Sequence, residues 1–277
     1  MNKKTIVYGL LVVILALAFT ACSGSGGGKS LNSATELKEY LDKQPANSPD
    51  QPIKVTMKAN DMMIKDIVEV IKNAGKYVSL DLSGSPLTKI EEAFRDCTPL
   101  AGITIPDSIT NIWSSAFLGT AWFNNQPDGV VYVGKAALGY KGTMPANTSI
   151  NIKDGTKVIA SSAFWDLGSL TSVTIPNSVT SIGDMAFSGT GLTSVTIPNS
   201  VTSIGMFAFS CNNLTSVTFQ GMISSGNLGG EYYVGGGEYI WASPFWKDLH
   251  DKYLAGGIGT YTTTAAPVNR DSKWTKQ

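Results

Sequence analysis

The sequence predicts a mainly β repeat solenoid with short helical caps at both ends. The segment Leu170–Ile182 recurs without a change as Leu192–Ile204, and its opening recurs once more from Leu214, always 22 residues apart. Each copy is followed or preceded by an Ala-Phe pair, and earlier Ala-Phe pairs stand at 93–94 and 116–117. Only 15% of the residues are charged while 29 are glycine, a balance that favours many short strands and turns over long surface helices.

The apolar positions of one unit indicate how it folds. Val173 and Ile175 alternate with Ser172 and Thr174, so a short strand has one buried and one exposed face. Pro176 lacks an amide proton and ends the strand ladder. A shorter extended stretch and the Ala-Phe corner complete a coil of 22 to 23 residues, a period that fits leucine-rich repeats. We expect roughly six turns to stack at ~4.8 Å spacing, each Phe on its neighbour.

The repeat is broken once, at about residues 121–146. The range Val130–Tyr140, with Gly134 near its centre, is typical of a β-hairpin with a glycine-initiated turn. We expect this inserted hairpin to leave the solenoid on one side or to replace one turn. Trp122 and Phe123 precede it, and they either pack beneath the hairpin or contact a ligand.

Segments outside the repeat, with helix and strand patterns, are predicted to close both ends of the stack. A terminal turn without such a cover would expose an apolar edge. Ser33 and Glu36 form a capping box before a helix, Ile53–Met57 has strand character, and Met62–Ala74 has helical spacing. Near the other end, Ser243 and Pro244 favour the start of a helix. The predicted organisation is an N-terminal α/β cap at 31–76, the leucine-rich-repeat solenoid at 77–221 and a C-terminal cap at 222–277.

Residues 1–21 have the features of a secretory signal peptide, with basic Lys3 and Lys4 ahead of an almost continuous apolar run. An uncleaved transmembrane helix is the alternative, but no basic stop-transfer cluster follows the run. Phe19–Cys22 resembles the lipobox of bacterial lipoproteins, which implies cleavage before Cys22 and attachment of lipid to it. Residues 22–30 are rich in Gly and Ser and form a flexible tether. The predicted location is the bacterial cell envelope, at the outer membrane or cell surface.

The repeat resembles the BspA-like family of bacterial leucine-rich repeats. The signature Leu-x-x-Val-x-Ile-Pro, seen from Leu170 to Pro176, is followed by an Ile-Gly-x-x-Ala-Phe corner, and the likeness covers about 80–219. The lipobox and the Trp-Thr-Lys-Gln tail also look like surface lipoproteins of oral spirochaetes of the Treponema type. This resemblance implies a cell-surface adhesin whose partners are host extracellular-matrix proteins or bacterial surface proteins.

Composition argues against several other functions. Lys plus Arg and Asp plus Glu number 21 each, so no charge excess points to nucleic acid. His250 is the single histidine, so a site built on several histidines is excluded, and we expect it on the surface of the capping helix. Cys97 and Cys211 occupy similar phases of units several turns apart, beyond disulfide reach, and are predicted to be buried free thiols. No cofactor is expected.

The candidate partner-binding residues are the outward hydroxyls of the strand face, which form a nearly uncharged ladder: Thr104, Ser172, Thr174, Ser194, Thr196, Ser216 and Thr218. Leucine-rich repeats commonly bind partners along this concave sheet. Ser and Thr also simply suit exposed strand positions. The sequence therefore predicts a non-enzymatic binding or adhesion lipoprotein. The alternative is a structural or scaffold lipoprotein of the envelope that is not exposed to the outside.

Overall fold

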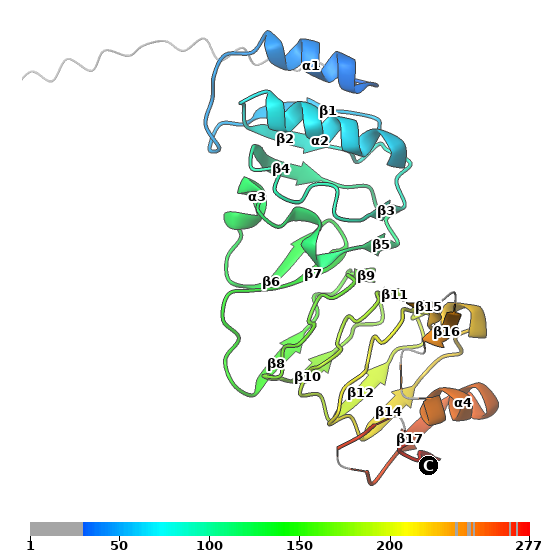
Figure 1. The fold of residues 1–277 in the computed structure, drawn as a ribbon. Coiled ribbons are helices and arrows are strands. Elements are labelled where there is room, and N and C mark those ends of the chain that lie inside the picture. Colours follow the sequence, from blue (N-terminus) through cyan, green and yellow to red (C-terminus); the bar gives the residue numbers. More distant parts are fainter. Residues whose placement is uncertain (1–29, 236–237, 243–244, 246, 266, 270) are drawn as a thin grey trace, which may run out of the picture.

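The computed structural model describes residues 30–235, 238–242, 245, 247–265, 267–269 and 271–277, with only the backbone described within 230–242. The predicted signal peptide, Cys22 and the tether up to residue 29 lie outside this part of the chain. The described residues form an elongated stack of turns, with strands along its sides and helices near both ends (Figure 1). This arrangement confirms the predicted mainly β repeat solenoid with short helical caps.

The N-terminal segment places two helices beside the first strands. Its elements are α1 (Ala34–Asp42), β1 (Ile53–Thr56), η1 (Asp61–Met63), α2 (Ile64–Asn73) and β2 (Val78–Asp81). The hydroxyl of Ser33 accepts the amide proton of Glu36 at 3.1 Å and caps α1 as predicted. Gly75, at φ +62°, follows α2, where a left-handed residue commonly ends a helix. Since β1 already pairs in parallel with β2, the strand stack begins inside the segment that the sequence assigns to the cap.

The inserted hairpin takes the place of one turn on the short-strand side. The elements here are β3 (Lys89–Ile90), β4 (Leu100–Thr104), β5 (Asn111–Ile112), η2 (Ser114–Phe117), α3 (Ala121–Asn124), β6 (Gly129–Val133), β7 (Ala136–Lys141) and β9 (Val158–Ile159). β7 pairs antiparallel with β6 and parallel with β9. A Cβ at Gly139, whose φ is +152°, would meet the carbonyl oxygen of Ala163 at 2.5 Å. Glycine therefore lets β7 lie directly on the backbone of the next unit.

The C-terminal half follows the regular repeat. It contains β8 (Thr148–Asn151), β10 (Leu170–Thr174), β11 (Ser181–Ile182), β12 (Ser194–Ile197), β13 (Ser203–Ile204) and β14 (Ser216–Phe219). The short strands β9, β11 and β13 form one parallel ladder. The long strands are grouped differently: β1, β2 and β4 form one sheet, β8 and β10 a second, and β12 and β14 belong to a third.

A column of phenylalanine rings runs through the core, in two runs instead of one. Phe187 stacks on Phe164 and on Phe209, with ring centroids 5.2 Å apart in both pairs. In the N-terminal half, Phe117 stacks on Phe94 at 5.3 Å and meets Trp122 edge-on at 5.2 Å. The expectation that each Phe stacks on its neighbour fails between Phe117 and Phe164, because the hairpin and Trp122 fill that place. Trp122 thus packs into the stack, the first of the two alternatives considered for it.

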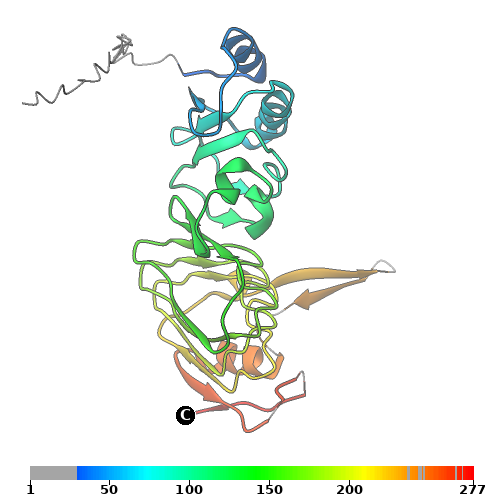
Figure 2. The same cartoon turned by 90° about the vertical axis from the view of Figure 1, so that its left-hand side faces the viewer.

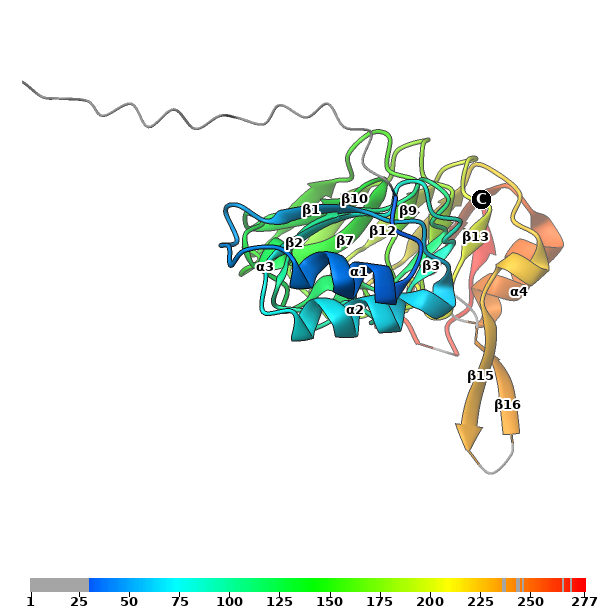
Figure 3. The same cartoon turned by 90° about the horizontal axis from the view of Figure 1, so that it is seen from above.

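The C-terminal cap adds strands that the sequence pattern did not predict. Its elements are η3 (Ser225–Asn227), β15 (Gly230–Gly235), β16 (Glu238–Ala242), α4 (Lys247–Gly256), β17 (Gly259–Thr262) and β18 (Thr275–Lys276). β17 runs antiparallel to β14 and in turn pairs with β18. β15 and β16 form a hairpin that projects from the body (Figures 2 and 3). The predicted helix start at 243–244 lies outside the described residues.

Two residues of the C-terminal cap, His250 and Trp274, are more deeply buried than the sequence pattern indicates. His250 is only 9% exposed, so the expectation of a surface histidine is wrong, because α4 lies against β17 and β18. Trp274, from the C-terminal tail, is fully buried, and its backbone amide donates to Oδ2 of Asp248 at 2.7 Å. The tail is therefore part of the core of the cap.

Candidate interaction surface

The long strands of the C-terminal half carry two rows of hydroxyl and amide side chains on one face. Strand register places the members of each row side by side within β8 and β10 and within β12, β14 and β17. Residues of the same repeat phase extend the rows from β10 to β12. One row contains Ser149, Ser172, Ser194, Ser216 and Thr262, and the other contains Asn151, Thr174, Thr196, Thr218 and Thr260.

The structure brings four of the predicted residues together around one open groove between β10 and β12. The groove has a volume of about 370 Å³ and is lined by the exposed side chains of Ser172, Thr174, Ser194 and Thr196, with apolar Val195 between them. Its other lining residues are apolar or amide side chains. The centre of the predicted surface is therefore polar, uncharged and accessible.

The remaining three predicted residues are placed differently. Ser216 and Thr218 are half-buried because β17 covers that edge of β14, and the Thr218 and Thr260 hydroxyls are hydrogen-bonded at 2.9 Å. Thr104 is exposed but lies on β4, in the separate N-terminal sheet, beside the carboxylate-bearing Asp81. The expectation of one nearly uncharged ladder from Thr104 to Thr218 is thus wrong, since the inserted hairpin and α3 interrupt the long strands after β4.

The groove exists because β10 and β12 are neighbours that do not share a ladder. They lie in different sheets, although elsewhere the same two turns approach so closely that a Cβ at Gly191 would meet the carbonyl oxygen of Gly168 at 2.4 Å. The facing edges of β10 and β12 carry backbone N–H and C=O groups that no sheet pairing satisfies. Such groups must form hydrogen bonds to water or to a partner molecule.

Ser149, Asn151, Thr260 and Thr262 belong to this surface but were missed by sequence reasoning. The unit containing β8 is recognisable as a repeat although Lys153 stands where Pro106, Pro176 and Pro198 stand in three other units, but its outward side chains were not included among the candidates. The strand β17 lies in a segment with no repeat signal, and only the short alternation around Tyr261 indicates it. The position of both threonines follows from the pairing of β17 with β14.

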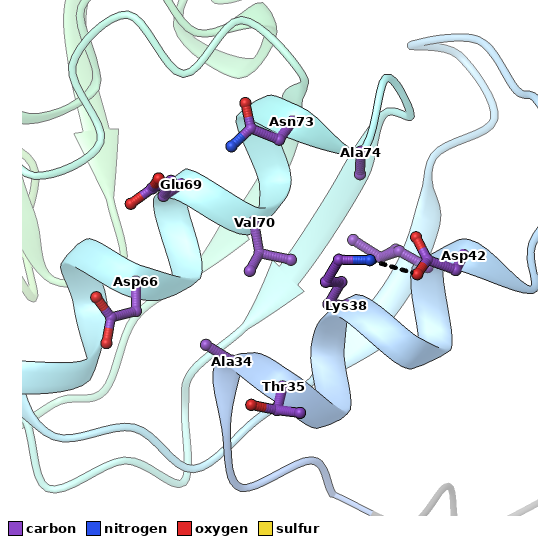
Figure 4. Close-up of a pocket in the computed structure, with 10 residues that line it drawn as sticks. Ala34, Thr35, Lys38, Asp42, Asp66, Glu69, Val70, Asn73 and Ala74 are labelled. Carbon is purple, nitrogen blue, oxygen red and sulfur yellow. Dashed lines mark hydrogen bonds and ion pairs between the residues drawn. The ribbon is translucent and has the colours of Figure 1, made fainter.

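A second, charged cleft lies between α1 and α2, on the N-terminal cap. It has a volume of about 410 Å³. Figure 4 shows Lys38 ion-paired to Asp42 on α1, with Asp66 and Glu69 on the facing helix and Val70 between the two helices. The hydrogen bond from Lys38 holds the pKa of Asp42 below its ordinary value. The lining is made of charged, polar and apolar side chains from the two helices.

Comparison with known proteins places this repeat in a family. Residues 69–137 and 140–228 match the BspA type leucine-rich repeat region in six copies, more than half of the chain. The chain belongs to the BspA-type leucine-rich repeat family. No curated protein sequence matches it.

Two solved structures resemble this BspA-type chain. One is a leucine-rich cell surface protein from Faecalibacterium prausnitzii A2-165, with 22% identity, 77% of this chain and 49% of that chain covered, and a TM-score of 0.28. The other is a leucine-rich repeat protein from Bacteroides ovatus ATCC 8483, with 16% identity, 66% and 50% covered, and a TM-score of 0.24. The BspA-type chain thus spans about half the length of each.

The two cysteines of the BspA-type repeat lie in its core. Cys97 and Cys211 are both buried and free, as predicted, and burial raises the pKa of each thiol to about 11. Among the described residues, His, Cys, Asp and Glu side chains form no group of three that could hold a metal ion. Within the same residues, no helix combines the length and apolar character needed to cross a membrane.

Proposed function

We propose that this chain is a non-enzymatic cell-surface binding lipoprotein, anchored by lipid at Cys22, whose strand face docks a host extracellular-matrix protein or a protein on a neighbouring bacterium. The observation that supports the proposal is the groove between β10 and β12, where Ser172, Thr174, Ser194 and Thr196 stand exposed around unpaired strand edges. Its lining groups do not ionise near neutral pH, which suits binding rather than acid–base chemistry.

The chemistry of the groove limits the strength and type of binding. Hydroxyl and amide groups donate and accept hydrogen bonds, and the strand edges add backbone groups able to pair with a partner's backbone. Each such contact replaces a hydrogen bond to water, so its net contribution is about 0.5–1.5 kcal/mol. We therefore expect modest affinity per molecule, weak dependence on salt, and a gain in avidity when many anchored copies engage one surface.

The test is binding of the purified full chain to immobilised matrix proteins and to intact bacteria, with charges introduced into the groove. We expect both Thr196→Lys and Thr196→Glu to weaken binding by about ten-fold or more, because a charge buried at an interface without a partner is costly. Using both signs prevents a fortuitous ion pair from masking the effect. Thr202→Lys is the matched control, an exposed threonine at a short-strand turn.

Two results would contradict the proposal. The first is that the full chain binds neither surface, and the second is that it binds one with equal strength in both Thr196 variants and the parent. Protease shaving of intact cells separates the proposal from a scaffold role inside the envelope. A surface protein is clipped together with known surface proteins, whereas a scaffold that faces inward survives.

A further inference from the structure

A second groove lies where the inserted hairpin meets the Ala-Phe corners, away from the strand face. It has a volume of about 230 Å³ and takes its walls from η2, α3, β7 and the corner on both sides of Phe164. Three aromatic residues and three leucines line it: Phe123, Tyr140, Trp165, Leu118, Leu138 and Leu167. It shares no lining residue with the groove between β10 and β12, so binding at this second groove does not depend on the proposed function.

Two of these residues depart from the repeat at one position. The residue after each Ala-Phe pair is Ser188 and Ser210 in the two regular units, but Leu118 and Trp165 in the units on either side of the hairpin. Trp165 is 58% exposed and Leu118 is 42% exposed. Neither side chain is needed to fill the core, because the buried Phe beside it already does so. Large apolar groups in the open, at a position where serine suffices, indicate a contact surface.

The aromatic walls are held in place by buried structure. Phe164, next to Trp165, is fully buried and stacks on Phe187 at 5.2 Å. The hydroxyl of buried Thr120 accepts the amide proton of Phe123 at 3.0 Å, which fixes the first turn of α3. Tyr140 is held by the pairing of β7 with β6. The backbone beneath these side chains is thereby anchored, which reduces the conformational entropy that a ligand must remove on binding.

The polar groups in the groove are neutral. Ser114, Ser115, Ser162 and Tyr140 are its hydroxyl-bearing lining residues, and the lining contains no charged side chain. The hydroxyl of Ser115 donates to Oε1 of Glu92 at 2.8 Å, and that carboxylate is already paired with Arg95 at 3.2 Å. A charged ligand would find no counter-ion among the lining residues, so the groove suits a neutral one.

The combination of flat apolar faces with hydroxyls at the rim defines the ligand further. A pyranose ring has C–H groups on its faces and hydroxyls around its edge, so it can lie against an aromatic ring while its edge hydrogen-bonds to serines. Cavities that enclose a whole small molecule have about 300–1,000 Å³. The smaller, open groove suits one or two ring-sized units of a longer chain, which can extend out at either end.

We propose that this groove binds a neutral glycan, with one sugar ring against Trp165 and its hydroxyls bonded to the serines of the opposing walls. A proline-rich peptide also offers C–H faces to aromatic grooves. The serine and tyrosine residues that line so small a groove favour the polyhydroxylated ring.

The experiment measures binding of cellohexaose, laminarihexaose and chitohexaose to the full chain by calorimetry and by the shift of tryptophan emission. Decaproline and a heparin hexasaccharide serve as the peptide and charged-glycan probes. Trp165→Ser introduces the residue that the next two units carry, so the fold should be kept, and circular dichroism checks this. Trp165→Phe keeps a flat ring, and Met222→Ser removes an equally exposed apolar side chain outside the groove.

The expected result is that at least one neutral hexasaccharide binds the parent, Met222→Ser and Trp165→Phe with similar affinity, and Trp165→Ser about ten-fold more weakly or worse. Three results would overturn the proposal: no neutral hexasaccharide binds at millimolar concentration, Trp165→Ser binds as well as the parent, or decaproline alone binds in a manner that requires Trp165.

Discussion

The phenylalanine column allows a quantitative test of how the turns hold one another. Phe187 is fully buried between two rings, Phe164 and Phe209, each at 5.2 Å. Phe94 is also fully buried, but among the described residues it stacks on one ring, that of Phe117. Replacing either residue by leucine keeps an apolar side chain and removes the ring, so the two variants differ in the number of stacked pairs lost.

The expected loss of stability follows from the number of stacked aromatic pairs that each substitution removes. A stacked aromatic pair contributes about 0.5–1.5 kcal/mol beyond the burial of its area. Phe187→Leu should therefore lose about 1–3 kcal/mol of stacking, and Phe94→Leu about 0.5–1.5 kcal/mol. The loss of apolar volume is the same in both variants, so it cancels in the comparison. Phe187→Leu is expected to lower the free energy of unfolding about 0.5–1.5 kcal/mol further than Phe94→Leu.

Urea unfolding followed by far-ultraviolet circular dichroism measures both losses, and native-state hydrogen exchange reports whether the turns around each site open separately. The reasoning is refuted if Phe94→Leu is at least as damaging as Phe187→Leu while exchange shows one cooperative unit. In that case the stability would reside in the area buried by each ring and not in its stacking.

Two further predictions concern the buried thiols and a pair of glycines. Burial raises the pKa of Cys97 and Cys211 from 9.0 to about 11, so the unfolded chain loses these protons first. The contribution of the two thiols to stability is therefore complete below pH 9 and is lost between pH 9 and 11. In that range the free energy of unfolding should fall more steeply than in a Cys97→Ala/Cys211→Ala double variant, and parallel curves would contradict this prediction. Gly75→Ala, at φ +62° with open space around it, should cost about 1 kcal/mol. Gly139→Ala should lower the free energy of unfolding, measured by heat or urea, at least about twice as much, because its Cβ would also meet a carbonyl oxygen at 2.5 Å. Equal losses in the two variants would show that the hairpin moves freely on its neighbour.

The repeated core could be predicted from sequence because its side chains recur at one phase of every unit. Leu170, Val179, Ile182 and Phe187 are all buried, as their periodicity indicates. Val173 differs from these residues, because its side chain is only partly buried. The reason is visible in the fold: Val173 lies on β10, along the groove where the sheet is open.

The candidate surface was predictable only in part, because a motif specifies a position within a turn and not the neighbour of that turn. Thr104 carries the same local pattern as Thr174, yet its partner on β2 is Asp81, and on the other side the inserted hairpin interrupts the long strands after β4. Thr260 and Thr262 were beyond sequence reasoning because β17 reaches β14 across a hairpin and a helix. His250 was misplaced for the same reason, as its burial depends on strands that the pattern did not reveal.

The reversal of strand direction at β17 has a consequence for self-assembly. In a solenoid of parallel strands, the last turn offers the same kind of open edge as every turn before it, and a second copy could continue the coil without limit. Because β17 runs antiparallel to β14 and carries β18 on its outer side, its hydrogen-bonding pattern no longer matches a parallel ladder. The β17–β18 edge therefore disfavours continuation of the parallel coil by a second copy at this end of the stack.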